Sequence, residues 1–141
     1  MISLRDALQE AEQNADKAKS DAALYFGCRN RAHDFIYEEE MNAAAASGAL
    51  TRLKVAFSRE AAKKDYVQHH IAADSKDVYA MLSDTTNPGY LYICGDGKHM
   101  AKDVNRVLHA IVEEEGTCSP AEAEKIVHEW AEQGRYLKDV W

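Results

Sequence analysis

Side chains suited to binding a phosphate group follow an apolar segment near the middle of the chain. Residues 53–57 predict a buried strand, and five residues with hydroxyl, cationic, aromatic and amide groups come after it: Ser58, Arg59, Lys64, Tyr66 and Gln68. A 2′-phosphate on an adenosine is bound by a hydroxyl donor and a guanidinium, ideally with a second cation beside them. The first three residues supply these groups, the tyrosine ring can stack on adenine, and the glutamine adds a donor. The segment therefore predicts a site for a 2′-phosphorylated nucleotide, with a solvated loop as the alternative that spacing leaves open.

The charge distribution is compatible with a small anionic ligand. The 141 residues carry a net charge of -7, which argues against a protein that wraps nucleic acid. Between Thr51 and Lys64, however, five cations stand against one anion, Glu60. A basic segment in an acidic protein favours a small anion over a polyanion. On charge alone, an ordinary solvated surface explains the clustering equally well.

A second candidate site begins at Cys94, at the end of the apolar segment 90–94. Gly95, Asp96 and Gly97 follow it, and a helix is expected to start directly afterwards. A strand end followed by glycines and a helix N-terminus lets a ligand approach the backbone closely. Cys94 has no obvious base beside it, which argues against a cysteine hydrolase. Taken by itself, it is most simply interpreted as a buried structural cysteine.

The last three residues, Asp139, Val140 and Trp141, form the third candidate. An exposed indole at a frayed chain end gains nothing, so Trp141 is expected to pack on something flat or apolar. An anchor that fixes the last strand in the core is the simpler interpretation. No metal site is predicted: the adjacent histidines at 69 and 70 face different directions, and the three cysteines lack CxxC spacing.

Helices and strands are expected to alternate along the chain. Helices are predicted over residues 3–19, from a cap at Asp34 to Gly48, and over 66–72, 76–83, 98–115 and 120–133; strands are predicted over 22–27, 53–57, 90–94 and 135–141. This alternation predicts an α/β fold, a three-layer doubly wound parallel sheet with helices on both faces. We expect one domain over 1–141, with residues 1–20 as a leading helix. The first strand of such a fold precedes that helix, so it is expected to be missing.

The motifs resemble, in their order, one known family. They are FGCRNR at 26–31, DFIY at 34–37, AFSRE at 56–60, YVQH at 66–69, YICGD at 92–96, MAKDV at 100–104 and GRYLKDVW at 134–141. Together they cover residues 22–141 and resemble the NADPH–haemoprotein reductases, also called cytochrome P-450 reductases. The resemblance implies a ferredoxin-NADP reductase-like NADP-binding domain, and it identifies the chain as an incomplete piece of a diflavin oxidoreductase.

The resemblance also implies a role for each candidate residue. The five residues of the phosphate-binding segment would hold the 2′-phosphate of NADP(H), Arg29 would lie near its other phosphates, and Asp103 would be a further contact. Cys94 and Asp139 would assist hydride transfer at the nicotinamide. Trp141 would stack on the FAD ring and swing away to admit the nicotinamide. Gly97 stands where the family usually has alanine, which would loosen the following helix start.

The whole family member implies further partners and a location. Electrons would pass from NADPH to FAD, then to FMN, and then to a haem protein such as cytochrome P-450 or cytochrome c. The FAD and FMN domains would be partners of this piece, at the cytosolic face of the endoplasmic reticulum. No membrane segment and no secretory signal are predicted within the 141 residues. Two alternatives stay open: another diflavin protein, sulfite-reductase-like or pyruvate-linked, and a catalytically inactive fragment that only binds nucleotide.

Overall fold

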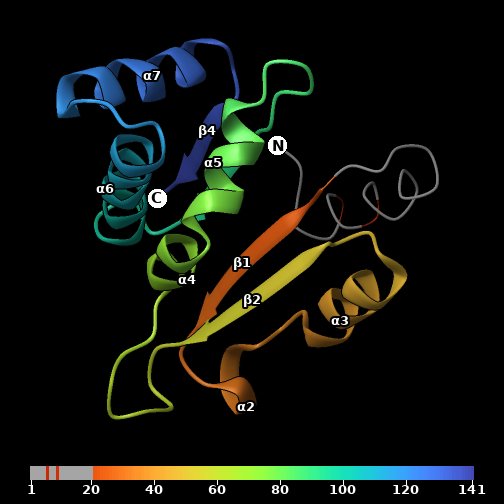
Figure 1. Cartoon of the computed structure of the whole chain (residues 1–141). Helices are drawn as coiled ribbons and strands as arrows, with labels where there is room; N and C mark the ends of the chain where they lie inside the picture. The colour runs from red at the N-terminus through yellow and green to blue at the C-terminus, as the bar shows by residue number, and fades with distance from the viewer. Residues whose placement is uncertain (1–5, 7–8, 10–20) are drawn as a thin grey trace. The chain divides into compact units, whose positions relative to one another are not determined.

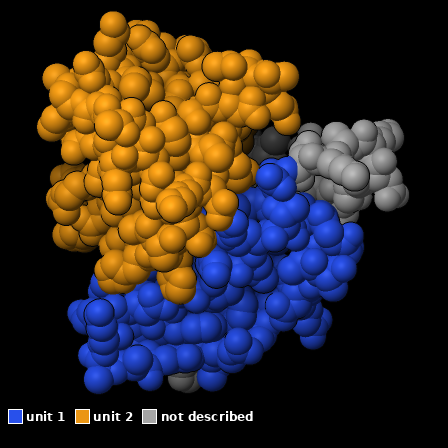
Figure 2. All heavy atoms as spheres, in the orientation of Figure 1, with its two compact units in different colours: residues 1–67 blue, residues 68–141 orange. Residues whose placement is uncertain are grey.

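The computed structural model describes Asp6, Gln9 and residues 21–141 of the chain. In the described part, helices alternate with strands that pair in parallel (Figure 1). The chain divides into two compact units, residues 1–67 and residues 68–141 (Figure 2), and each is described by itself. The predicted helix over 3–19 lies outside the described residues, apart from Asp6 and Gln9, which are helical.

The first unit is built around a pair of parallel strands, β1 (Ala23–Cys28) and β2 (Arg52–Phe57). The pairing runs in register from Ala23 opposite Arg52 to Cys28 opposite Phe57. Two helices connect the strands, α2 (Arg31–Asp34) and α3 (Glu38–Ser47). Parallel strands need such a crossover, because the chain must return to the same end of the sheet before the second strand begins.

The core of the first unit lies around Met41 and Ala44, the buried residues of α3. Ala49 and Leu50 complete it, and apolar side chains from both strands pack against these four residues. Gly48 ends α3 in the left-handed conformation with φ 84°, as its position predicted. The cap predicted at Asp34 is wrong, since α3 begins at Glu38. Its first turn carries three glutamates, which favour a helix N-terminus electrostatically.

The second unit contains the other parallel pair, β3 (Leu91–Gly95) and β4 (Tyr136–Val140). The helices α6 (Met100–Glu115) and α7 (Pro120–Glu132) form the connection between these strands, and α5 (Ser75–Ser83) precedes them. The boundary between the units falls within α4 (Val67–Ala73). Every strand and helix predicted after residue 52 is confirmed, with its ends shifted by one or two residues.

The core of the second unit forms where α6 and α7 pack on each other and on the strands. The buried face of α6 consists of Ala101, Val104, Leu108, Ile111 and Val112. From α7, Ala123, Val127 and Trp130 are buried. Each large apolar side chain removed from water contributes roughly 1.5–3 kcal/mol, so this contact stabilises the unit.

The junction between α7 and β4 is fixed by Arg135. Its Nη1 donates to the carbonyl oxygens of Leu82 at 2.8 Å and Gly89 at 3.0 Å. Its guanidinium lies 5.7 Å from the centre of the Trp130 ring. One side chain therefore links the end of α5, the turn before β3 and the end of α7. It holds the start of β4 in place.

Candidate functional site

The two loops that follow β1 and β2 are tied together in the first unit. Because the strands are parallel, both loops leave from the same edge of the pair. Past the strand ends, Ser58 N donates to the carbonyl of Cys28 at 2.9 Å, and Arg59 N donates to that of Arg29 at 3.0 Å. These bonds set Ser58 and Arg59 beside Arg29, and both arginine side chains are exposed. The backbones of Ser58, Arg59 and Arg29 thus lie close together at one strand edge.

A further arginine, Arg31, fastens this edge. Its backbone N–H donates to the carboxylate of Glu60, the residue after Arg59. Its guanidinium pairs with Glu38 at 2.6 Å and lies 5.4 Å from the centre of the Phe57 ring. The carboxylate next to Arg59 is therefore engaged by a donor. Sequence reasoning missed Arg31, because neither its type nor its spacing indicates that it reaches a loop so distant in the chain.

Lys64 and Tyr66 also lie in the first unit, whereas Gln68 belongs to the second. Lys64 is exposed, and the side chain of Tyr66 is 37% exposed, just before α4 begins. Lys63 is exposed as well, so two ammonium groups follow the Ser58–Arg59 pair in the same loop. Flexible cations on an exposed loop can adapt to an anion, whereas a planar guanidinium on a fixed backbone sets its orientation.

In the second unit, the register of β3 and β4 sets Cys94 opposite Asp139. The Sγ atom of Cys94 donates to Oδ2 of Asp139 at 3.8 Å. The pKa of the thiol is raised, first by desolvation and then by the charge and the hydrogen bond of Asp139. Cys94 is therefore a protonated thiol at neutral pH, which agrees with the argument against a cysteine nucleophile. The interpretation as a buried cysteine is wrong, because its side chain is exposed.

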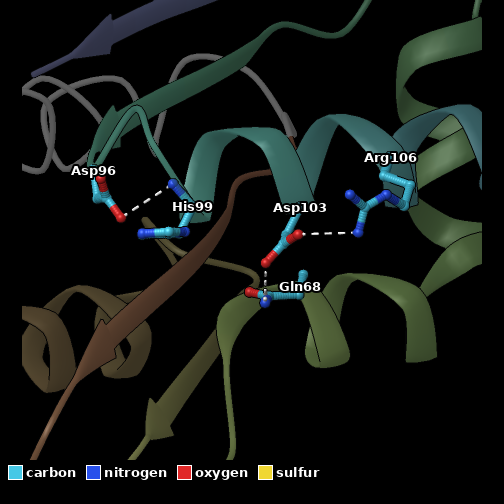
Figure 3. A network of polar contacts seen from close by, with 5 residues as sticks. All are labelled: Gln68, Asp96, His99, Asp103 and Arg106. Carbon is cyan, nitrogen blue, oxygen red and sulfur yellow. Dashed lines mark hydrogen bonds and ion pairs between the residues drawn. The ribbon is translucent and has the colours of Figure 1, made fainter.

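The loop after β3 is organised by Asp96 (Figure 3). Its Oδ1 accepts from Lys98 N at 2.9 Å and its Oδ2 accepts from His99 N at 3.2 Å. Backbone hydrogen bonds, chiefly that of Lys98, lower the pKa of this carboxyl group. These bonds form a turn over residues that were predicted to be helical, so α6 starts at Met100 rather than at 98.

The last residue is attached to the same loop by its backbone. Trp141 N donates to the carbonyl of Gly95 at 3.1 Å, and Gly97 N donates to the carbonyl of Trp141 at 3.0 Å. A Cβ at Gly97 would lie 3.1 Å from Val140 Cγ2, so glycine there allows the last strand to approach closely. The indole itself is 79% exposed, and the interpretation of Trp141 as a core anchor is wrong. Backbone bonds hold the residue while its ring stays accessible.

A third group of polar residues joins α4 to α6 within the second unit (Figure 3). Gln68 Nε2 donates to Asp103 Oδ2 at 3.4 Å, and Arg106 Nη1 donates to Asp103 Oδ1 at 3.1 Å. Gln68 and Asp103 are both predicted site residues, and the structure brings them into contact. Arg106 was not among the candidates. Its spacing of three from Asp103 on a helix was the available signal.

In the described part of the chain, no group of histidine, cysteine and acidic residues is arranged to hold a metal ion. None of the helices in the same part of the chain combines the length and the apolar character needed for crossing a membrane.

The chain is similar to known oxidoreductases. The family described as "Oxidoreductase NAD-binding domain" matches residues 3–106. NADPH--cytochrome P450 reductase of Sus scrofa is 41% identical over 92% of this chain and 19% of its own length. The Drosophila melanogaster protein of the same name is 40% identical over 97% of this chain and 20% of its own length. That of Dictyostelium discoideum is 36% identical over the same shares. The chain thus spans about a fifth of the length of these curated relatives.

Proposed function

The chain belongs to the oxidoreductase NAD-binding domain family, and from this premise we propose that it is the NADPH-binding module of a cytochrome P-450 reductase-like diflavin enzyme. One observation carries the proposal. Two parallel strands end side by side, and their loops are bonded so that Ser58 and Arg59 lie beside Arg29. Open α/β sheets bind ligands at the carboxyl ends of their strands, and this edge presents donors for phosphate.

The donor set fits a 2′-phosphorylated adenosine. Ser58 supplies a hydroxyl and Arg59 an exposed guanidinium, and Lys64 adds an ammonium group in the same loop. Tyr66, which is 37% exposed, is assigned to stacking on the base. Glu60 would repel a phosphate, but it is engaged by the backbone of Arg31. We assign these residues and Gln68 to the adenosine 2′-phosphate, Arg29 to the other phosphates of the nucleotide, and Asp103 to a further nucleotide contact.

The residues of the second unit fit the reacting end of the nucleotide. The chemistry here is hydride transfer from bound NADPH to FAD. The Cys94 thiol keeps its proton and donates a hydrogen bond to Asp139, so the sulfur stays neutral beside the position assigned to the nicotinamide. Trp141 has an exposed ring on a backbone that hydrogen bonds hold in place. A side chain that covers a flavin and then moves aside needs both properties. Cys94, Asp139 and Trp141 are accordingly the catalytic residues of this proposal.

The family also supports the finer prediction of the fold. The parallel pairs β1–β2 and β3–β4, each with a helical crossover, are the units from which a doubly wound sheet is made. We assign the whole chain to a single NADP-binding domain with a three-layer sheet of the ferredoxin-NADP reductase type.

The partners follow from the relatives and are part of the same proposal. The FAD and FMN domains of the full-length enzyme are the neighbours of this module, and cytochrome P-450 and cytochrome c are its electron acceptors. The location is the cytosolic side of the endoplasmic reticulum. Because the chain spans about a fifth of its relatives' length, a second candidate function is nucleotide binding without turnover. Cytochrome c reduction by the purified chain would contradict that candidate.

The 2′-phosphate assignment is tested by comparing retention on immobilised 2′,5′-ADP and 5′-AMP. We expect the wild-type chain to bind 2′,5′-ADP more tightly. Arg59→Ala should weaken that binding by about tenfold or more, since a charge-assisted hydrogen bond contributes roughly 1.5–3 kcal/mol. Its binding to 5′-AMP should be unchanged.

The matched control is Lys54→Ala, which removes an exposed cation of β2 within the same basic segment. This variant should keep the wild-type preference. Equal retention of the wild-type chain on both matrices would contradict the assignment of these residues to the 2′-phosphate.

A further inference from the structure

We propose that Arg106 is a positioning residue for nucleotide specificity: through Asp103 it orients the amide of Gln68 for binding the adenosine end of the nucleotide. This inference rests on the proposed function, which assigns Gln68 and Asp103 to the nucleotide but gives Arg106 no role. It starts from the contacts drawn in Figure 3, where the Asp103 carboxylate lies between the other two side chains.

The backbone of Asp103 is held firmly in place. It lies in the first turn of the sixteen-residue helix α6, and its N–H donates to the carbonyl of His99 at 2.9 Å. The Asp96 side chain binds the turn immediately before the helix. The neighbouring residues Ala101 and Val104 are buried. Any change in the direction of the Asp103 carboxylate must therefore come from rotation of its own side chain.

Arg106, whose own side chain is 79% exposed, restrains that rotation by pairing with one of the two carboxylate oxygens. Its Nη1 lies 3.1 Å from Oδ1, while Oδ2 is left to accept from Gln68. The pairing also offsets the negative charge of Asp103, whose side chain is 37% exposed. An uncompensated carboxylate near a nucleotide phosphate would repel it. The ion pair thus makes an acidic residue compatible with an anionic ligand.

Asp103 in turn decides which way the Gln68 amide faces. An ionised carboxylate is an acceptor only, so the amide must present its nitrogen to Asp103 and its oxygen elsewhere. The second N–H and the carbonyl oxygen of Gln68 then have fixed directions. In the absence of the carboxylate, the amide could present either end, and the Gln68 side chain would become ordered only when the ligand binds. We assign to Arg106 the role of ordering this side chain before the ligand binds, which lowers the entropic cost of binding.

The test measures the affinity for soluble 2′,5′-ADP by calorimetry at low ionic strength, in a double-mutant cycle of Arg106→Ala and Gln68→Ala. We expect Arg106→Ala to weaken binding about twofold to fivefold in the wild-type background, and to have little effect once Gln68 is removed. Arg106→Lys, which keeps the charge, should restore part of the affinity. Lys102→Ala is the control, because it removes an exposed cation of α6 from the position next to Asp103.

A direct readout of orientation is the side-chain amide signal of Gln68 in ¹H–¹⁵N spectra of the ligand-free chain, assigned by its loss in Gln68→Ala. Arg106→Ala should shift this signal, whereas Lys102→Ala should not. If Arg106→Ala binds like the Lys102 control while Arg59→Ala is weakened, the positioning role is overturned and the proposed function stands. Additive effects of Arg106 and Gln68 would overturn it as well. A wild-type chain that does not prefer 2′,5′-ADP would overturn the proposed function and, with it, this role.

Discussion

The contact between Cys94 and Asp139 pairs a weak acid with a carboxylate, and its consequence is a thiol that keeps its proton. A cysteine beside a cation becomes a reactive thiolate, whereas a cysteine beside an anion does not. The desolvation and the carboxylate both raise the pKa of Cys94. This environment keeps the side chain neutral, and it is unsuited to nucleophilic attack.

The chemistry of this pair can be measured by alkylation. At pH 7.5 we expect Cys94 to react with iodoacetamide more slowly than an unstructured cysteine, because less of it is thiolate. Asp139→Asn removes the negative charge, so the pKa should fall and the rate should rise. The experiment is best done with Cys118→Ser as the background, leaving the buried Cys28 as the other cysteine. A rate that is unchanged in Asp139→Asn would show that the carboxylate does not control the thiol.

At the scale of residues, the pairing of the strands brings together candidates that stand at strand ends. The contact of Cys94 with Asp139, and that of Arg59 with Arg29, follow from parallel strands that end at one edge. Arg31 and Arg106 were missed because their roles depend on side-chain directions and on loop backbone bonds. Those details arise from tertiary packing, and a pattern of residue types does not contain them. The ligand-binding roles themselves stay predictions.

Among the elements, α7 has the clearest local determinant, a capping box. Ser119 Oγ accepts from Glu122 N at 3.2 Å, and the Glu122 carboxylate accepts from Ser119 N at 3.0 Å. Pro120 occupies the first helical position, where a missing N–H does no harm. Two backbone donors that α7 would otherwise leave unpaired are thereby satisfied. This start was predicted from the sequence because all of its parts are adjacent in the chain.

Loss of this cap should destabilise the chain measurably. We expect Ser119→Ala to lower the free energy of unfolding by about 1 kcal/mol, the usual contribution of an N-cap side chain. Urea denaturation followed by circular dichroism would measure it. Thr85→Ala, which removes an exposed hydroxyl outside the helices, should change stability by much less. Equal midpoints for the two variants would mean that the cap contributes nothing.

Other element boundaries were harder to predict, because the competing signals are of similar strength. Asp34 has the right type for a cap, but the chain uses it as the last residue of α2. Asp96 has the same chemistry and does bind backbone N–H groups, yet it does so in a turn that delays the start of α6. In both cases the existence of the helix was predicted and its first residue was not. Local capping chemistry cannot distinguish a helix start from a turn.

At the scale of the whole molecule, the alternation of strands and helices was enough to predict mixed α/β structure with parallel pairing. Both observed pairs are parallel, as the long crossovers require. The same pattern predicted one domain with a three-layer sheet. Both stay proposals, supported by membership of the oxidoreductase NAD-binding domain family. The division into two compact units was not predicted. Hydrophobic periodicity identifies the buried face of each element, but it does not specify how compactly distant segments cluster.

The stability of the chain should depend on alkaline pH through Tyr136. This residue is buried, and desolvation raises the pKa of its phenol from the ordinary value of 10.0 to about 12. The folded state therefore keeps the proton between about pH 10 and pH 12, where the unfolded state loses it. The resulting stability is fully present below pH 10 and is lost as the pH rises toward 12.

The variant Tyr136→Phe isolates this effect, because it keeps the ring beneath Lys138 and removes the ionisable hydroxyl. It also removes the 2.8 Å hydrogen bond to Asn105, so its stability at neutral pH should be somewhat lower. Between pH 10 and 12, however, thermal denaturation should show a shallower loss of stability than in the wild-type chain. Parallel pH profiles for the two proteins would contradict the assignment to Tyr136.

The parallel pairing also has a consequence for the order of folding. Cys94 and Asp139 are 45 positions apart, and the bonded ends of the first pair, Ala22 and Thr51, are 29 apart. Bringing such distant segments together has an entropic cost, and contacts formed after the chain has collapsed are needed to offset it. The hairpin of α6 and α7 involves closer neighbours, so we expect it to nucleate first and the strands of that unit to align late. The thiol–carboxylate contact would then be among the last features to form, and a chain with all its helices in place would still lack it.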